Sequence, residues 1–234
     1  MKIQIDYRVF KAMAVLACKD DGRHAIACIM IDPDPKGAKI YATDGTRLGV
    51  YLCEPSEINF EDGADKEKIR LPVPNFSKLG CTARDPMLTA EITAINGGDS
   101  NEIVYSNNTE FSQRMKLWNA KYPNTDQVIP NKSVPATGLD IDLSRLTGFA
   151  EVAKILGGNS GMQAIHMRFH GDGAPLSVFT ACPRFYGLIM PLRGDYDPPD
   201  WAKQTPKPEE PAPTQEPPPI AQEAAPQAPQ PATA

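Results

Sequence analysis

The fold is decided by residues 2–54, which read KIQIDYRVFKAMAVLACKDDGRHAIACIMIDPDPKGAKIYATDGTRLGVYLCE. The first six of these residues alternate between polar and apolar side chains, which is typical of a strand. Apolar residues then recur at helical spacing from 8 to 19, before the turn-forming run Asp20-Asp21-Gly22. Three strand-like runs follow, separated by turns rich in Asp, Pro and Gly, at 25–32, 38–44 and 47–54. The stretch predicts one unit of a strand, a helix and three strands.

The same unit occurs twice more along the chain, so the sequence predicts three repeats. The second copy follows a polar, charged run and has a strand, a short helical piece and three strands at 68–73, 74–82, 88–95, 101–107 and 110–118. The third copy has the same elements at 138–144, 145–156, 162–170, 175–181 and 185–193. In the third copy, Ser144 is the expected helix cap and Gly157-Gly158 is the expected helix end.

Repeats that combine one helix with antiparallel strands predict an α+β fold with the helices on one face of the sheets. The first two copies span residues 1–60 and 61–130, and the third spans residues 131–194. Because the number of copies is odd, one sheet edge is left over, which we expect a partner chain to cover.

The last segment, residues 195–234, differs in composition from the rest of the chain. Pro, Ala, Gln and Glu dominate it, and it holds half of the chain's 24 prolines. Such a segment has too few large apolar side chains to offset the entropy cost of ordering it. The sequence therefore predicts a disordered, Pro-rich tail.

Charge and cysteine content limit the class of protein. Residues 1–194 contain 22 Lys+Arg and 22 Asp+Glu, so the net charge of −5 arises in the tail. A neutral body indicates nucleic-acid binding only if its basic residues gather on one surface. The five cysteines are widely spaced and include no CxxC pair, which favours buried thiols in a reducing compartment. With no signal-peptide pattern and no apolar run of membrane length, the sequence predicts a cytoplasmic protein.

Three short motifs go beyond this pattern. Residues 42–50 read ATDGTRLGV, residues 121–130 read KYPNTDQVIP, and residues 188–193 read LIMPLR. They resemble, in the same order, the ATDGHRLAV, FPDYxxVLP and VVMPMR segments of bacterial DNA polymerase III beta sliding clamps. By this resemblance, residues 1–130 correspond to one whole clamp domain and residues 131–194 to the second half of the last domain.

The resemblance implies a sliding-clamp fold of half-domain repeats, with helices lining a central hole for DNA and sheets on the outside. The implied function is that of a DNA replication processivity clamp, or a clamp-like protein, of a phage or plasmid type. In the family, the three motifs meet in a hydrophobic cleft that binds short peptide motifs of DNA polymerase, clamp loader and repair proteins. Carried over by position, this cleft would consist of Ile26, Thr43, Gly45, Arg47, Leu48, Pro123, Val128, Leu188, Met190, Pro191 and Leu192.

The residue types suit such a cleft. Leu48, Leu188 and the flexible Met190 can present an apolar trough to the hydrophobic anchors of an extended peptide. Two departures from the family pattern leave the preferred peptide motif open. Thr46 replaces a His, and Asn124-Thr125 replaces Asp-Tyr.

Basic residues on the expected helices are the candidates for DNA contacts that do not read sequence: Arg8, Lys11, Lys19, Lys78, Arg84, Arg145 and Lys154. The alternative, that they lie on ordinary solvated helix faces, stays open. A family ring contains twelve half-domain repeats, so a closed homo-oligomer of this chain would need about four copies, a tetrameric ring.

Two other functions stay open. A monomer or small oligomer with the same cleft would act as a decoy or adaptor that competes for clamp-binding peptides. The other alternative is an enzyme on an unrelated α+β fold, although the sequence shows no catalytic motif. The glycine-rich run 157–161 lacks the Lys of a phosphate-binding loop. His166 and His170 fall in an expected strand, where their spacing does not build a zinc site. The sequence predicts no catalytic residue, metal or cofactor.

Overall fold

The computed structural model describes residues 1–20, 22–61, 63–65, 67–79, 86–94, 101–107, 111–117, 120–130, 140–157 and 164–192. All of them belong to a unit that spans Met1–Gly194. The predicted tail, residues 195–234, lies outside the described residues. No helix in the described part of the chain is long and apolar enough to cross a membrane.

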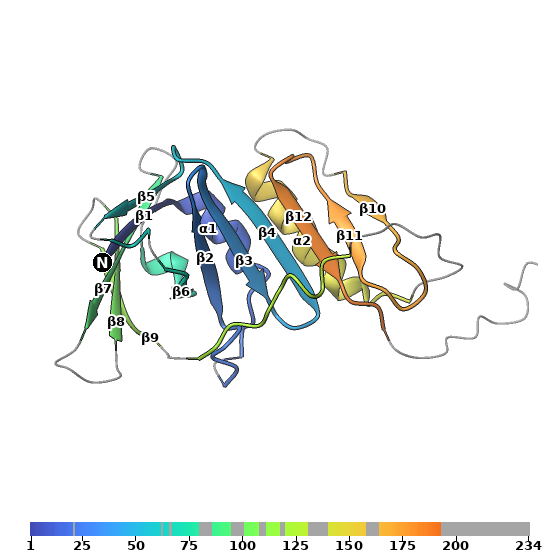
Figure 1. Cartoon of the computed structure of the whole chain (residues 1–234), viewed down its shortest axis with the longest axis horizontal. Coiled ribbons are helices and arrows are strands. Elements are labelled where there is room, and N and C mark those ends of the chain that lie inside the picture. The colour runs from blue at the N-terminus through green and yellow to red at the C-terminus, as the bar shows by residue number, and fades with distance from the viewer. Residues whose placement is uncertain are drawn as a thin grey trace, which may run out of the picture. The chain divides into compact units, whose positions relative to one another are not determined.

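The three predicted repeats are recognisable in the order of the elements (Figure 1). The first contains β1 (Lys2–Asp6), α1 (Tyr7–Ala14), β2 (Cys28–Asp34), β3 (Gly37–Thr43) and β4 (Arg47–Cys53). After β5 (Ile58–Glu61), the second contains β6 (Ile69–Pro72), the 3-10 helix η1 (Phe76–Lys78), β7 (Met87–Ala94), β8 (Asn101–Ser106) and β9 (Ser112–Leu117). The third contains α2 (Leu143–Leu156), β10 (His166–Arg168), β11 (Leu176–Phe179) and β12 (Phe185–Ile189).

The strands form two antiparallel sheets, and the first two repeats exchange strands between them. One sheet has the order β5-β1-β7-β8-β9, and the other has the order β10-β11-β12-β4-β3-β2-β6. The first strand of repeat one, β1, pairs with β7 of repeat two, and the first strand of repeat two, β6, pairs with β2 of repeat one. Each of these two repeats therefore completes the sheet of the other. The α+β class predicted from the sequence is confirmed.

Helix α1 supplies much of the core between these sheets. Asp6 caps it, because its carboxylate accepts a hydrogen bond of 2.7 Å from the backbone N–H of Arg8. Phe10, fully buried, packs against Tyr105 of the five-stranded sheet with ring centroids 6.0 Å apart. Met13, also fully buried, lies on the same helix. Burying each such side chain contributes roughly 1.5–3 kcal/mol to folding.

The third repeat joins the first through β12, which pairs with β4 and makes the seven-stranded sheet continuous. At the centre of this seam Gly187 lies directly opposite Gly49. A Cβ atom on Gly49 would come within 2.4 Å of Leu16 after α1, and one on Gly187 within 2.3 Å of Phe149 on α2. The two glycines thus let both helical segments press onto one face of the sheet. Figure 1 shows α1 and α2 side by side behind that sheet.

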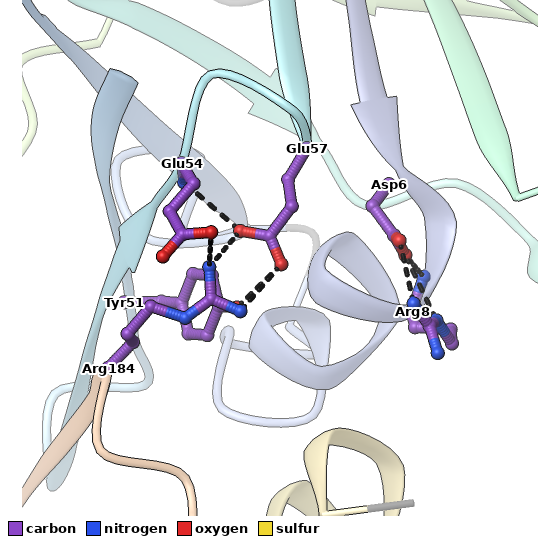
Figure 2. Close-up of polar contacts among 6 residues, drawn as sticks. All are labelled: Asp6, Arg8, Tyr51, Glu54, Glu57 and Arg184. Carbon is purple, nitrogen blue, oxygen red and sulfur yellow. Dashed lines mark hydrogen bonds and ion pairs between the residues drawn. The ribbon is translucent and has the colours of Figure 1, made fainter. Parts of the chain in front are cut away.

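Polar contacts reinforce the same seam next to Tyr51 of β4 (Figure 2). Arg184, just before β12, donates two hydrogen bonds to Glu57, of 2.6 and 2.9 Å. Its guanidinium also lies 3.2 Å from a carboxylate oxygen of Glu54 and 5.2 Å from the centre of the Tyr51 ring. The Tyr51 hydroxyl donates to Glu57 at 3.0 Å. Residues near the end of the described chain are thereby tied to the turn that follows β4.

The structure corrects several of the expected elements. Strand β5 was not predicted, and the predicted helical piece 74–82 is only one 3-10 turn in its described part. The predicted strand 138–144 is absent from residues 140–142, and 138–139 lie outside the described residues. Helix α2 begins at Leu143 and is capped by Asp142, not by Ser144, whose backbone N–H instead donates to the Asp142 carboxylate at 2.8 Å.

The missing strand has a physical explanation in the strand exchange. In repeats one and two, the first strand pairs with the other repeat of the domain. The third repeat has no such counterpart within the described chain, so its leading segment finds no sheet to join. A β-strand without a neighbour leaves its backbone hydrogen-bonding groups unpaired.

Candidate functional site

A cleft opens on the face of the seven-stranded sheet opposite the helices. Leu48 and Leu188 form the cross-strand pair next to the Gly49–Gly187 pair, so their side chains point to the other face. The cavity there has a volume of about 210 Å³. It is lined by six apolar side chains, four uncharged polar ones, two arginines and one glycine: Arg23, Ile26, Thr43, Gly45, Thr46, Arg47, Leu48, Pro123, Asn124, Thr125, Val128, Leu188 and Met190.

One wall of the cleft is the segment 120–130, which crosses this face of the sheet (Figure 1). Tyr122 anchors the segment, because its buried ring packs in a small cluster with Leu48 and Leu188. Val128, farther along, keeps 38% of its surface exposed. The segment therefore leaves an apolar side chain accessible at the mouth of the cleft.

The turn between β3 and β4 forms a rigid second wall around the Asp44 carboxylate. One oxygen of Asp44 accepts hydrogen bonds of 2.8 Å from the backbone N–H groups of Thr46 and Arg47, and the other forms an ion pair of 2.7 Å with Arg47. Burial alone would raise the pKa of Asp44, but the hydrogen bonds from Thr46 and Arg47 outweigh it and hold that pKa below its usual value. Gly45 has a φ of 91°, a conformation that favours glycine.

The third wall comes from the end of β12 and is fixed to the other elements through the main chain. The backbone N–H of Met190 donates to the Thr46 carbonyl at 2.9 Å. The carbonyl of Met190 accepts a hydrogen bond from the Arg145 side chain of α2. Arg47 reaches the Arg145 carbonyl in turn, at 3.4 Å. The position of Met190 thus depends on both the β3–β4 turn and α2.

The structure brings together nine of the eleven residues predicted for the cleft. Pro191 and Leu192 do not line it, which corrects that part of the prediction. The reason is that the backbone leaves the cleft after Met190, and the N–H of Leu192 donates to the Asp140 carbonyl at 2.8 Å. Four lining residues were absent from the predicted set: Arg23, Thr46, Asn124 and Thr125. Three of these lie inside the quoted motifs, whereas no sequence pattern singles out Arg23.

The candidate DNA-contacting residues are divided in their roles. Lys19, Lys78 and Lys154 are exposed, on or next to the helical elements. Others already have intramolecular partners: Arg8 pairs with the cap of its own helix at 3.1 Å, Lys11 lies 5.6 Å from the Tyr7 ring centre, and Arg145 supports the cleft. Arg84 lies outside the described residues. Lys11 and Lys19 line a larger cavity of about 670 Å³ beside α1, together with Glu151.

Among the described residues that line the cleft there is no carboxylate, cysteine or histidine side chain. Burial raises the pKa of the Cys28 thiol to about 11, so this thiol stays protonated at neutral pH. His170 hydrogen-bonds the buried Ser177 at 2.6 Å, and Ser177 hydrogen-bonds Tyr186 at 2.8 Å. Among the described residues, no group of three His, Cys, Asp or Glu side chains is placed to hold a metal ion.

The size of the cleft suits partner side chains better than a whole small molecule. A volume of about 210 Å³ is below the roughly 300–1,000 Å³ of sites for drug-sized ligands. It has room for about one or two large apolar side chains of a partner. Arg23 at the rim, whose side chain donates to the Asp44 carbonyl at 3.2 Å, adds positive charge at one end.

No protein-family model matches this sequence, and no curated protein matches it. Solved structures do match its fold. DNA polymerase III subunit beta from Borrelia burgdorferi is 15% identical, with a TM-score of 0.57 over 83% of this chain and 63% of that chain. The sliding clamp from Bacillus subtilis is 13% identical, with a TM-score of 0.54 over 83% and 65%. The beta clamp of Helicobacter pylori, bound to a DNA ligase peptide, is 13% identical, with a TM-score of 0.52 over 82% and 65%.

These matches confirm that the chain has the fold of the bacterial sliding clamps, as the three motifs indicated. The chain spans less than two thirds of the length of the clamps it matches. At these low identities the similarity establishes the fold alone.

Proposed function

We propose that this protein is a clamp-like, non-catalytic DNA replication factor that docks short peptide motifs of polymerase, clamp loader or repair proteins in the cleft between β4, β12 and segment 120–130. The observation that carries the proposal is the meeting of the three motifs. They are far apart in the sequence, yet each contributes side chains to one apolar cleft. The fold agrees with this role, and the similar Helicobacter pylori clamp binds a DNA ligase peptide.

The cleft offers an extended peptide an apolar floor and a polar rim. Leu48 and Leu188 are almost fully buried and form the floor, whereas Met190 is half-buried and can adapt to the incoming side chain. One buried aliphatic or aromatic anchor contributes roughly 1.5–3 kcal/mol. Two anchors and a few main-chain hydrogen bonds are consistent with a micromolar affinity, about −8 kcal/mol.

A fluorescence-anisotropy titration with a labelled DNA ligase peptide tests the cleft. We expect micromolar binding to the wild type and a loss of more than about 1 kcal/mol in both Leu48→Ala and Met190→Ala, as for anchors at a hot spot. Leu52→Ala is the matched control, because Leu52 lies on the same strand, 49% exposed and outside the cleft lining. A scrambled peptide controls for charge. Equal affinity of the Leu48 and Leu52 variants, or no binding by the wild type, refutes the peptide-docking role.

The DNA-tethering part of the proposal rests on the helix face of the sheet. There α1 and α2 lie side by side and carry exposed lysines such as Lys154. We propose that several chains together surround double-stranded DNA and contact its phosphates without reading sequence. Retention of the protein on nicked circular DNA, and its release when the DNA is linearised, measures encirclement directly. Equal retention on both DNA forms contradicts a ring.

The alternative role is a decoy or adaptor that competes for clamp-binding peptides without forming a ring, for which the cleft alone would suffice. Both roles need the cleft, so peptide binding does not separate them. The mass in solution does, because a ring requires a closed oligomer and a decoy does not.

A further inference from the structure

The pairing of the first two repeats shows how a repeat of this chain completes its sheet. In each repeat, the first strand of the triplet is covered by a strand from the other repeat. Thus β2 is covered by β6, and β7 is covered by β1. Four apolar residues of these covered strands, Ile29, Ile31, Leu88 and Ala90, have no exposed surface.

In the third repeat the corresponding strand, β10, has an open edge. It pairs on one side with β11, where Met167 lies opposite Val178. On its other side no strand is present among the described residues. Met167 and Phe169 are 40% and 43% exposed, and His166 and Arg168 are exposed as well. An open edge with exposed apolar side chains is a surface for strand pairing with another chain.

The segment that leads into α2 corresponds to β1, the strand that leads into α1. Asp142 caps α2 in the way that Asp6 caps α1, each through its carboxylate and a backbone N–H two residues later. An isoleucine precedes each cap, and Ile5 is fully buried in β1. Ile141 is only partly buried, in a segment that forms no strand. Among the described residues, the third repeat thus has no strand beside β10, and its leading segment forms no strand, although the Asp140 carbonyl accepts a hydrogen bond from the Leu192 backbone.

We infer that β10 is the docking edge for a second copy of this chain, and that the segment Asp140–Asp142 of each copy pairs with β10 of the other. In one two-fold symmetric interface, a second copy supplies a strand for the edge of β10 and a partner strand for the segment Asp140–Asp142. The two third repeats then form a two-sheet unit like the one that repeats one and two form within a chain. The pairing is independent of peptide binding, because the cleft is built within one chain.

Charge complementarity supports the pairing of β10 with the segment Asp140–Asp142 of a second copy. In the β1–β7 pairing the cap residue Asp6 lies opposite Met87, the first residue of β7. The same register places Asp142 opposite His166, Ile141 opposite Met167 and Asp140 opposite Arg168. Each of the two carboxylates then faces a basic side chain, and the two exposed apolar residues face each other. Opposite charges placed directly across an antiparallel pair stabilise it, and like charges destabilise it.

The mass of the full chain in solution, measured by light scattering and by sedimentation across a concentration series, tests the inference. We expect a dimer, or an even-numbered assembly of dimers. Arg168→Asp should raise the dissociation constant about tenfold or more, because it places two carboxylates opposite each other. Asp140→Arg should do the same, and the double variant should recover wild-type association. Lys39→Asp, at an exposed position in the middle of the same sheet, is the matched control.

The inference is overturned if the wild type remains a monomer at about 100 µM or associates only as a trimer. It is also overturned by an Arg168→Asp variant that associates as tightly as Lys39→Asp, or by a charge-swapped double variant that is not rescued. Peptide titration of the same variants separates this interface from the proposed function. Wild-type peptide affinity in a dissociated variant supports an interface remote from the cleft.

Discussion

Replacing Arg184 tests how the third repeat is held to the first. Arg184→Met keeps most of the length and the apolar stem of the side chain but removes its charge and its donors. Glu57 then loses both hydrogen bonds from the guanidinium, of 2.6 and 2.9 Å. It keeps a 3.0 Å bond from the Tyr51 hydroxyl and one of 3.0 Å from the backbone N–H of Glu54. We expect the free energy of unfolding to fall by about 1–3 kcal/mol.

This magnitude follows from the partial burial of the pair. Breaking a fully buried ion pair costs about 3–5 kcal/mol, and breaking an exposed one about 0–1 kcal/mol. The side chains of Glu57 and Arg184 are 15% and 31% exposed, so the pair lies between these limits. Glu54, the second carboxylate on the same guanidinium, is 60% exposed. Glu54→Gln should therefore change the stability by less than about 0.5 kcal/mol, although it touches the same arginine.

Urea denaturation followed by fluorescence measures these differences, and a double-mutant cycle of Arg184→Met with Glu57→Gln isolates the pair. We expect a coupling energy of at least about 1 kcal/mol between Arg184 and Glu57. The reasoning fails if Arg184→Met unfolds like the wild type, or if Glu54→Gln costs as much as Glu57→Gln. Either result would mean that this contact does not hold the seam.

Three further predictions concern the seam and the cleft. Gly187→Ala should destabilise by about 1–3 kcal/mol, because its Cβ would lie 2.3 Å from the buried Phe149 ring. Gly49→Ala should cost less, because its shortest contact, of 2.4 Å, is with the end of the flexible Leu16 side chain, and Phe185 and Met13 lie farther away at 3.3 and 3.4 Å. Equal urea midpoints of the two variants would contradict this. Asp44→Asn should lose about 1–2 kcal/mol at pH 7. Because the folded-state pKa of Asp44 is lowered from its usual 3.8, the stability it contributes is present above pH 3.8 and is lost as the pH falls through the folded-state pKa, so the difference between the wild type and the variant in thermal scans should shrink as the pH falls below 3.8. Tyr122→Phe should raise stability by up to about 1 kcal/mol in the same scans, because the buried hydroxyl has no hydrogen-bond partner among the described residues. A loss of stability would instead mean that the hydroxyl has a hydrogen-bond partner.

Much of the fold could be predicted because the pattern of each repeat is local. Alternating and helical spacing identified the described triplet strands and both helices, since side chains in these elements meet at short sequence separations. Which sheet each strand joins was not predictable, because pairing depends on long-range contacts. Residues 140–142 illustrate the limit. Their sequence, Asp-Ile-Asp, resembles the end of β1, but a strand needs a partner, and the described chain offers none.

The cleft could be predicted only in part, for a similar reason. Eight of the nine predicted residues that line the cleft lie in the three motifs, whose order matches the clamps, so the resemblance transfers them together. Ile26 lies outside these motifs. Pro191 and Leu192 belong to the same motif, but a hydrogen bond from the Leu192 backbone to Asp140 leads the chain away. Arg23 enters from a loop, brought there by its bond to the Asp44 carbonyl. Such single tertiary contacts leave no signal in the local sequence.

Because β12 must pair with β4 to complete the cleft, the cleft is present only in the fully folded chain. Leu48 is synthesised early and Leu188 late, and they meet only when the last repeat has docked. A chain in which that repeat is detached, cleaved or not yet synthesised lacks the wall formed by Leu188 and Met190, so its cleft is incomplete. In the opposite direction, any peptide that occupies the cleft stabilises the docked state, by about 2.7 kcal/mol at a hundred times its dissociation constant. Docking of the last repeat and any binding of a peptide in the cleft are therefore thermodynamically linked.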